Sequence, residues 1–140
     1  MIKKILTLML LVSSWGFSQN IEYKADITAR EAYEMQKRGV LLIDVRTKKE
    51  YDFMRPTNAI LIESYFEING QRVFNENFVS QVEDLVKMDL SKEIVLICRS
   101  GSRTKEVATL LAKNGFSNVY NVKNGFVYDW VKANLPTQKQ

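Results

Sequence analysis

Hydrophobic positions along the chain alternate between short continuous runs and longer segments with helical spacing. The continuous runs are short, apolar and rich in branched residues, which is typical of buried strands, and they cover residues 40–45, 59–62, 94–97 and 119–122. The segments with helical spacing predict helices over residues 29–38, 48–53, 74–88, 103–114 and 126–134. This order predicts an α/β fold with a central, mainly parallel sheet of four to five strands and helices on both faces.

Polar residues at the ends of these segments support the predicted boundaries. Thr28 with Glu31, and Thr47 with Glu50, have the spacing of capping boxes, in which each side chain bonds the other residue's backbone N–H. Gly39 follows the first helix as a left-handed terminating residue. Asn69-Gly70 predicts a turn, and the polar tail from Pro136 is expected to fray.

The first 18 residues have the pattern of a secretory signal peptide. Lys3 and Lys4 precede an apolar run over residues 5–12, and Gly16 and Ser18 satisfy the small-residue rule for cleavage after Ser18. The apolar run is too short to span a bilayer, so no stable membrane insertion is expected after cleavage. We therefore expect an exported bacterial protein, periplasmic or secreted. Its parts would be a signal peptide (1–18), an N-terminal extension (19–26), one domain (27–134) and a polar tail (135–140).

Composition excludes several function classes. The net charge of +4 falls to about +2 without Lys3 and Lys4, and no basic stripe with interleaved aromatic residues is present, so nucleic acid is not an expected partner. The chain has no histidine, which excludes a Cys–His pair and histidine-ligated metals. One cysteine can form neither an internal disulfide nor a thiolate zinc site. We expect no metal and no cofactor.

The single cysteine, Cys98, stands where the strand over residues 94–97 stops. A short polar loop and a helix follow it, and the N–H groups of such a loop and first helical turn point at one spot, which suits an anion. This setting favours the thiolate form of a cysteine. Gly101 allows the loop to curl with positive φ.

An unpaired cysteine is unusual in an exported protein, which favours a reactive role for Cys98 over that of a small apolar residue at a strand end. Arg99 and Arg103 have two interpretations: they guide an oxyanion, with Arg103 turned back over the loop, or they are ordinary solvated charges. Asp44 and Arg46 end another strand, and the carboxyl ends of parallel strands share one edge of a sheet. A buried Asp44 needs a partner, for which we expect Arg46 or a loop N–H.

Residues 27–130 resemble a single-domain rhodanese, a sulfurtransferase. Residues 42–51 (Leu-Ile-Asp-Val-Arg-Thr-Lys-Lys-Glu-Tyr) look like the family's first motif, and residues 98–103 (Cys-Arg-Ser-Gly-Ser-Arg) look like its six-residue active-site loop. Gly115-Phe116, residues 119–122 and Gly125 with Trp130 resemble its closing segment. The chain departs from the family at residues 54–58 (Met54 to Asn58), where a Gly-His-Ile-x-Gly-Ala run is common, and at Asn124 of the closing Gly-Gly.

The resemblance implies that Cys98 attacks a sulfane sulfur and carries it as a persulfide. The donor would be a small sulfur-containing anion such as thiosulfate, or a persulfide, and the acceptor cyanide or a thiol, a protein thiol included. The resemblance makes Cys98 the catalytic residue, with Asp44 and Arg46 in support. The residues of the active-site loop that would bind the substrate are Arg99, Ser100, Gly101, Ser102 and Arg103.

Two other functions stay open. Phosphatases and arsenate reductases of related fold use a Cys-x5-Arg loop, one residue longer than the Cys98-x4-Arg103 spacing here, to fit a tetrahedral oxyanion. A non-catalytic rhodanese-like module would instead bind a partner or carry sulfur, with recognition at the altered stretch from Met54 to Asn58.

Overall fold

The computed structural model describes residues 21–140. The expected signal peptide lies outside the described residues. The strands of the central sheet are β1 (Ala25–Ile27), β2 (Leu41–Asp44), β4 (Ile60–Leu61), β7 (Ile94–Ile97) and β8 (Val119–Val122). The helices are α1 (Ala29–Lys37), α2 (Lys48–Phe53), α3 (Phe78–Leu85), α4 (Ser102–Lys113) and a π-helix, η1 (Phe126–Trp130). Two antiparallel pairs complete the fold, β5 (Tyr65–Ile68) with β6 (Gln71–Phe74) and β3 (Arg55–Pro56) with β9 (Thr137–Gln138).

The central sheet has the order β1-β8-β7-β2-β4, and every neighbouring pair in it is parallel. Asp44 at the end of β2 lies opposite Ile97 at the end of β7. The carboxyl ends of these two strands therefore meet at one edge of the sheet, as expected for parallel neighbours. The predicted α/β fold with a parallel central sheet is confirmed.

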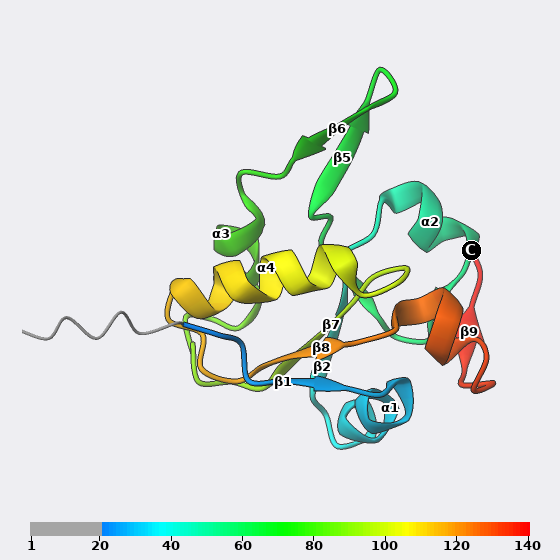
Figure 1. Cartoon of the computed structure of the whole chain (residues 1–140), viewed down its shortest axis with the longest axis horizontal. Helices are drawn as coiled ribbons and strands as arrows, with labels where there is room; N and C mark the ends of the chain where they lie inside the picture. Colours follow the sequence, from blue (N-terminus) through cyan, green and yellow to red (C-terminus); the bar gives the residue numbers. More distant parts are fainter. Residues whose placement is uncertain (1–20) are drawn as a thin grey trace, which may run out of the picture.

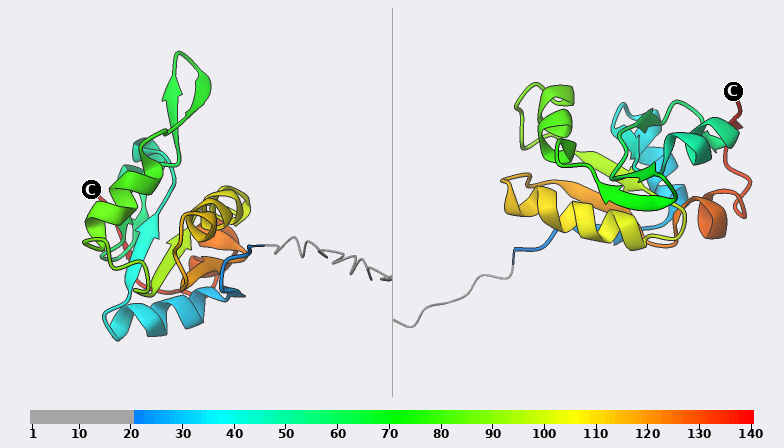
Figure 2. Two further views of the ribbon diagram at one scale, coloured as in Figure 1. Left: turned by 90° about the vertical axis from the view of Figure 1, so that its left-hand side faces the viewer. Right: turned by 90° about the horizontal axis from the view of Figure 1, so that it is seen from above.

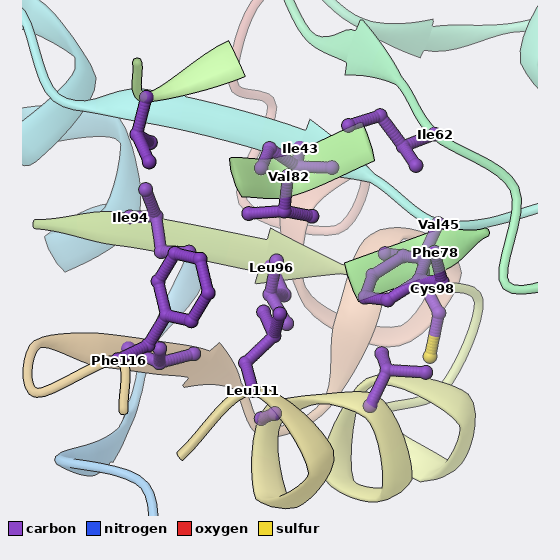
Figure 3. Close-up of a cluster of buried hydrophobic side chains, with 14 residues drawn as sticks. Ile43, Val45, Ile62, Phe78, Val82, Ile94, Leu96, Cys98, Leu111 and Phe116 are labelled. Carbon is purple, nitrogen blue, oxygen red and sulfur yellow. The ribbon is translucent and has the colours of Figure 1, made fainter. Parts of the chain in front are cut away.

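Helices cover both faces of the sheet, with α1 on one side and α3 and α4 on the other (Figures 1 and 2). Side chains alternate along β7, so that Ile94, Leu96 and Cys98 face the core formed with α3 and α4, whereas Val95 and Ile97 face the core formed with α1 and η1. Figure 3 shows Cys98 pointing into the first of these cores, beside Phe78 and Val45. Burial on both faces explains why the strand sequences are continuously apolar.

Both predicted capping boxes are present. The Thr28 side chain accepts a hydrogen bond from the N–H of Glu31 at the start of α1, and Thr47 accepts one from Glu50 at the start of α2, with the reciprocal bonds also formed. Gly39 follows α1 with φ of 94°. Within the described part of the chain, no helix is long and apolar enough to cross a membrane.

The hairpin formed by β5 and β6 was not predicted, and it takes up Phe74, the first residue of the helix predicted over residues 74–88. The helix α3 is shorter than predicted at both ends, since it begins at Phe78 and ends at Leu85. Asn69 and Gly70 both have positive φ, the geometry of a two-residue hairpin turn. At the base of the hairpin the Asn75 amide donates to the carbonyl of Glu63 (2.8 Å), and this bond holds the two strand ends together.

The chain ends and the last helix also differ from the prediction. Residues 25–27 form β1 on β8, although residues 25 and 26 belong to the predicted N-terminal extension, because this short strand gains its pairing only from the tertiary fold. The last helix is a π-helix over five residues, shorter than the predicted 126–134. The tail does not fray throughout, since Thr137–Gln138 pairs with Arg55–Pro56.

Candidate functional site

Cys98 lies directly after β7 and is fully buried. It is a free cysteine. Its sulfur sits at the start of the loop that leads into α4, between the sheet edge and the first turn of the helix. The strand fixes the Cα position of Cys98, and the core packing of Val45 and Phe78 fixes the direction of its side chain.

Two polar groups contact the Cys98 sulfur. The N–H of Gly101 donates to Sγ at 3.1 Å, and the Thr104 hydroxyl lies 3.4 Å from Sγ. The Thr104 hydroxyl also bonds the carbonyl of Gly101 at 3.1 Å. Thr104 therefore has two alternative acceptors, and it can turn its proton toward a sulfur that carries negative charge.

The loop and first turn of α4 also present N–H groups that have no acceptor among residues 21–140. These groups belong to Arg99, Ser100, Ser102, Arg103 and Thr104. Donors of this kind at a helix N-terminus stabilise an anion, and the helix dipole adds about 0.3–1 kcal/mol. The loop can therefore hold a terminal sulfur anion or an oxyanion.

Gly101 is the residue that lets the loop close. Its φ is +95°, and a Cβ at this position would overlap the carbonyl oxygen of Lys123, which follows β8. Gly125 meets the loop from the other side, since a Cβ added to it would fall 2.6 Å from the Cys98 carbonyl oxygen. The N–H of Phe126 donates to that carbonyl (2.8 Å), so the start of η1 holds the loop in place.

Asp44 and Arg46 form a buried ion pair at the same sheet edge. The Arg46 guanidinium donates to Asp44 through Nε (2.9 and 3.1 Å) and Nη2 (2.7 Å), and the Arg46 N–H also bonds Asp44 at 3.0 Å. We expected Arg46 or a loop N–H as the partner of the Asp44 carboxylate. Arg46 supplies both, through its guanidinium and its own backbone N–H. Arg46 also donates to the carbonyl of Met54 (2.7 Å) and lies over the Phe126 ring at 4.4 Å. The pair connects β2 to η1 and to the stretch from Met54 to Asn58.

Arg103 forms a two-pronged ion pair with Glu50 of α2. The distances are 2.7 Å from Nη1 to Oε1 and 3.0 Å from Nη2 to Oε2. Burial opposes the charge of both groups, but the ion pair outweighs it, so the pKa of Glu50 is lowered and the pKa of Arg103 is raised. Arg103 is therefore buried and paired, not an ordinary solvated charge. That it guides an oxyanion from above the loop stays a prediction.

The other loop side chains are exposed. Arg99, Ser100 and Ser102 point to solvent, and Arg99 lies over the Tyr128 ring at 5.3 Å. The stretch from Met54 to Asn58 lies at the same end of the molecule, where the N–H of Thr57 bonds the Pro136 carbonyl (3.1 Å). This stretch is therefore shaped by the C-terminal segment.

Sequence reasoning missed two residues of this site. The hydroxyl of Thr104 contacts the Cys98 sulfur. Thr104 could have been predicted from the sequence, because it follows Arg103 directly and lies about one helical turn after the loop glycine, Gly101. Glu50 forms the predicted capping box, but its partner Arg103 lies 53 residues away and leaves no local pattern. Within residues 21–140, no group of three or more His, Cys, Asp or Glu side chains could hold a metal ion.

Comparisons with known proteins give a consistent result. A family model described as the rhodanese-like domain matches residues 28–133. Thiosulfate sulfurtransferase GlpE of Haemophilus influenzae is 30% identical over 111 residues, which cover 79% of this chain and 91% of that protein. The tRNA uridine(34) hydroxylase of Buchnera aphidicola is 32% identical over 105 residues, which cover 73% of this chain and 31% of that protein.

Solved structures show the same fold. The crystal structure of Rv0390 from M. tuberculosis has a TM-score of 0.70 and 25% identity, and the match covers 85% of this chain and 100% of that one. The polysulfide-sulfur transferase homodimer of Wolinella succinogenes has a TM-score of 0.58 and 21% identity, over 83% of this chain and 79% of that one. The family match spans four of the five sheet strands (β2, β4, β7 and β8), the Cys98 loop and η1. This chain therefore belongs to the family of proteins with a rhodanese-like domain.

Proposed function

We propose that this protein is a sulfurtransferase that carries a sulfane sulfur on Cys98. The observation that carries the proposal is the hydrogen bond from the N–H of Gly101 to Sγ at 3.1 Å, in a loop whose other N–H groups have no acceptor among the described residues. A relative named thiosulfate sulfurtransferase, 30% identical over most of the chain, supports the same reaction class.

The reaction has two steps. In the first, the Cys98 thiolate attacks the outer sulfur of thiosulfate, the new S–S bond forms, the donor's S–S bond breaks, and sulfite leaves with the electron pair. A persulfide donor reacts in the same way and leaves as a thiolate. In the second step, an acceptor thiolate or cyanide attacks the outer sulfur of the persulfide, and Cys98 leaves as the thiolate.

The main contribution of the protein to this cycle is to stabilise negative charge on sulfur. The free N–H groups of the loop stabilise the terminal sulfur anion of the persulfide. No step needs a proton-transfer base, because every nucleophile is a thiolate or cyanide and every leaving group is a thiolate or sulfite. This agrees with a sequence that has no histidine.

Asp44, Arg46, Glu50 and Arg103 act as positioning residues. The Asp44–Arg46 pair fixes the sheet edge beside the loop, and the Glu50–Arg103 pair ties the first turn of α4 to α2. Arg99 is the loop side chain that remains free to meet an anionic donor, whereas Ser100 and Ser102 border the loop opening.

The donor is proposed to be thiosulfate or a persulfide and the acceptor a thiol or cyanide. The test is thiocyanate formation from thiosulfate and cyanide, measured for the wild type and for Cys98→Ser. We expect turnover in the wild type and none in Cys98→Ser. Turnover of an aryl phosphate that requires Cys98, with no thiocyanate formed, would overturn the proposal in favour of a phosphatase.

Export to the periplasm or the exterior is a further part of the proposal. It is supported by the sequence of residues 1–18, which has the charged, apolar and small-residue regions of a signal peptide. Mass measurement of the protein recovered from a periplasmic extract would test it. A mature chain that begins at Gln19 is expected, and a full-length chain recovered only from the cytoplasm would contradict export.

A further inference from the structure

The β5–β6 hairpin stands beside the Cys98 loop and forms one wall of a hollow at the site. Figure 1 shows the hairpin rising next to α2 and the N-terminal end of α4. A hollow of about 440 Å³ lies between these elements, a size within the range of small-molecule sites. Residues of α2, of the hairpin and of the loop line it together. They include Lys49, Glu50, Glu67, Arg72, Arg99 and Arg103.

The charged side chains that line this hollow carry a net positive charge. Glu50 and Arg103 neutralise each other in their ion pair. Within residues 21–140, Lys49, Arg72 and Arg99 form no ion pair, and Glu67 is the remaining carboxylate in the lining. Three unpaired cations against one unpaired carboxylate suit an anionic ligand, and the two arginines offer forked donors that match oxyanions.

The hairpin holds its charged side chains on the wall that faces the hollow. Glu67 and Arg72 lie directly opposite each other in the strand pair, on the same face as Tyr65 and Phe74. The Tyr65 hydroxyl donates to Glu106 of α4 at 2.6 Å, which anchors this face to the helix that begins at the loop. Phe66, Ile68 and Val73 occupy the opposite, exposed face.

The base of the hairpin is tied to the site as well. The N–H and the hydroxyl of Ser64 both donate to the carbonyl of Val45 at 3.0 Å. Val45 lies between Asp44 and Arg46, whose ion pair braces the same sheet edge. The base of the hairpin is therefore fixed relative to the Cys98 loop, and Arg72, two residues before the end of β6, belongs to the lining of the hollow.

We infer that Arg72 is a specificity-determining residue that selects doubly charged sulfur donors, and that Glu67 opposite it limits how strongly such anions bind. The inference rests on the proposed sulfur transfer at Cys98 and adds a hairpin residue to the donor site. The donor's charged end lies against Arg72 and Arg99, while its sulfane sulfur faces the loop above Cys98.

The test compares two donors that transfer the same kind of sulfur but differ in charge. Thiosulfate is a dianion, and methanethiosulfonate is a monoanion. Arg72→Gln is expected to raise the KM for thiosulfate about three- to tenfold, to change kcat less than about twofold, and to raise the KM for methanethiosulfonate less. Arg72→Lys keeps the charge and is expected to recover part of the loss.

Two further variants control for general electrostatics. Glu67→Gln removes the opposing charge and is expected to lower the KM for thiosulfate about two- to fivefold. Lys92→Gln changes the net charge as Arg72→Gln does, but Lys92 lies before the amino end of β7, whereas the Cys98 loop follows its carboxyl end. The KM values of the Lys92→Gln variant should therefore match those of the wild type. Equal KM values in Arg72→Gln and Lys92→Gln, or an equal rise for both donors, would overturn the inference.

A binding measurement separates failure of this inference from failure of the proposed function. Calorimetric titration of Cys98→Ser with thiosulfate measures donor binding without sulfur transfer. Arg72→Gln in that background should weaken binding by the same factor as it raises KM. If the wild type forms no persulfide, the proposed function fails, and this titration still decides the role of Arg72. Unchanged affinity would overturn it.

Discussion

The Thr104 hydroxyl is the only side-chain polar group among the described residues that contacts the Cys98 sulfur, at 3.4 Å. It can donate either to the sulfur or to the Gly101 carbonyl, 3.1 Å away. In the proposed cycle the sulfur alternates between a thiolate and the inner atom of a persulfide. A hydroxyl that switches acceptor can follow this change in charge without moving the backbone.

Replacement of Thr104 should therefore affect the reaction more than the fold. Thr104→Val keeps the shape of the side chain, and we expect it to slow persulfide formation about three- to tenfold while it lowers the free energy of unfolding by about 1 kcal/mol. Thr104→Ser retains the hydroxyl and should restore most of the rate. Stopped-flow measurement of persulfide formation checks this. Equal rates for the Val and Ser variants would contradict a role for the hydroxyl.

The Glu50–Arg103 pair predicts a pH dependence of stability. Because Arg103 lowers the pKa of Glu50, ionised Glu50 contributes stability that is fully present above its unfolded pKa, and that is lost as the pH falls through its lower folded pKa. Glu50→Gln should therefore lower the free energy of unfolding by about 1–2 kcal/mol near pH 7.

The same difference should shrink as the pH falls below about 4.5, where Glu50 of the unfolded chain takes up a proton first, and it should disappear below the lower pKa of folded Glu50. Urea unfolding of both proteins across this pH range measures it. Glu34→Gln removes a carboxylate from an exposed pair with Lys37 and serves as the control, with little effect expected at either pH. A difference for Glu50→Gln that grows as the pH falls would contradict a lowered pKa of Glu50 in the folded protein.

At the scale of elements, the loop between β7 and α4 depends on a glycine. Gly101→Ala must adopt φ near +95° and place its Cβ against the Lys123 carbonyl. We expect a loss of at least about 2 kcal/mol in stability and a displaced loop in which the N–H of residue 101 no longer donates to Cys98 Sγ. Gly39→Ala, which has a similar φ of +94° but no atom within 4 Å of its Cβ, is the matched control.

Thermal unfolding and thiocyanate formation measure the two effects. Gly39→Ala should lose about 1 kcal/mol of stability and keep its activity. If both variants keep full activity, the close approach of the loop to Lys123 does not matter for the site.

The sequence predicted those elements that carry their own local pattern. The apolar run at residues 94–97 and the capping boxes at Thr28 and Thr47 are complete within a few residues, so the strands and helices they mark were placed correctly. β1 has only three residues, and its partner strand β8 lies nearly a hundred residues further along the chain, so no local pattern predicts this strand. The β5–β6 hairpin did have a local signal, because Asn-Gly is the residue pair typical of a two-residue hairpin turn.

The residues of the candidate site also fall into those that a local motif predicts and those that only the fold brings together. Cys98, Gly101 and the Asp44–Arg46 pair could be found because each lies in a short motif at a strand end. The pairing of Arg103 with Glu50 and the approach of Arg72 to the loop join segments that the fold brings together. No spacing in the sequence encodes such contacts, so only the three-dimensional arrangement reveals them.

At the scale of the whole molecule, the C-terminal segment closes the face that holds α1 and η1. Leu135 is buried in that core. The Pro136 carbonyl accepts hydrogen bonds from Trp130 Nε1 (3.0 Å) and from the N–H of Thr57 (3.1 Å). These contacts join the end of the chain to the stretch from Met54 to Asn58, where the sequence departs from the family.

The loss of stability on C-terminal truncation should therefore depend sharply on whether Leu135 and Pro136 are removed. Ending the chain after Asn134 removes Leu135 and Pro136, and we expect a loss of about 3–5 kcal/mol in the free energy of unfolding. Ending it after Pro136 removes only the exposed β9 residues and the two that follow, and should cost about 1 kcal/mol or less. Thermal or urea unfolding distinguishes the two, and equal stability of the two truncations would contradict the role assigned to Leu135 and Pro136.

The central claim is that Cys98 carries the transferred sulfur, and the mass of the intact protein tests it most directly. After incubation with thiosulfate and removal of the excess, the wild type should be heavier by one sulfur atom, and addition of a thiol or cyanide should return it to its original mass. Cys98→Ser should show no gain under the same conditions. A wild-type protein that gains no sulfur from thiosulfate or from a persulfide donor, or a gain that persists in Cys98→Ser, would contradict the account.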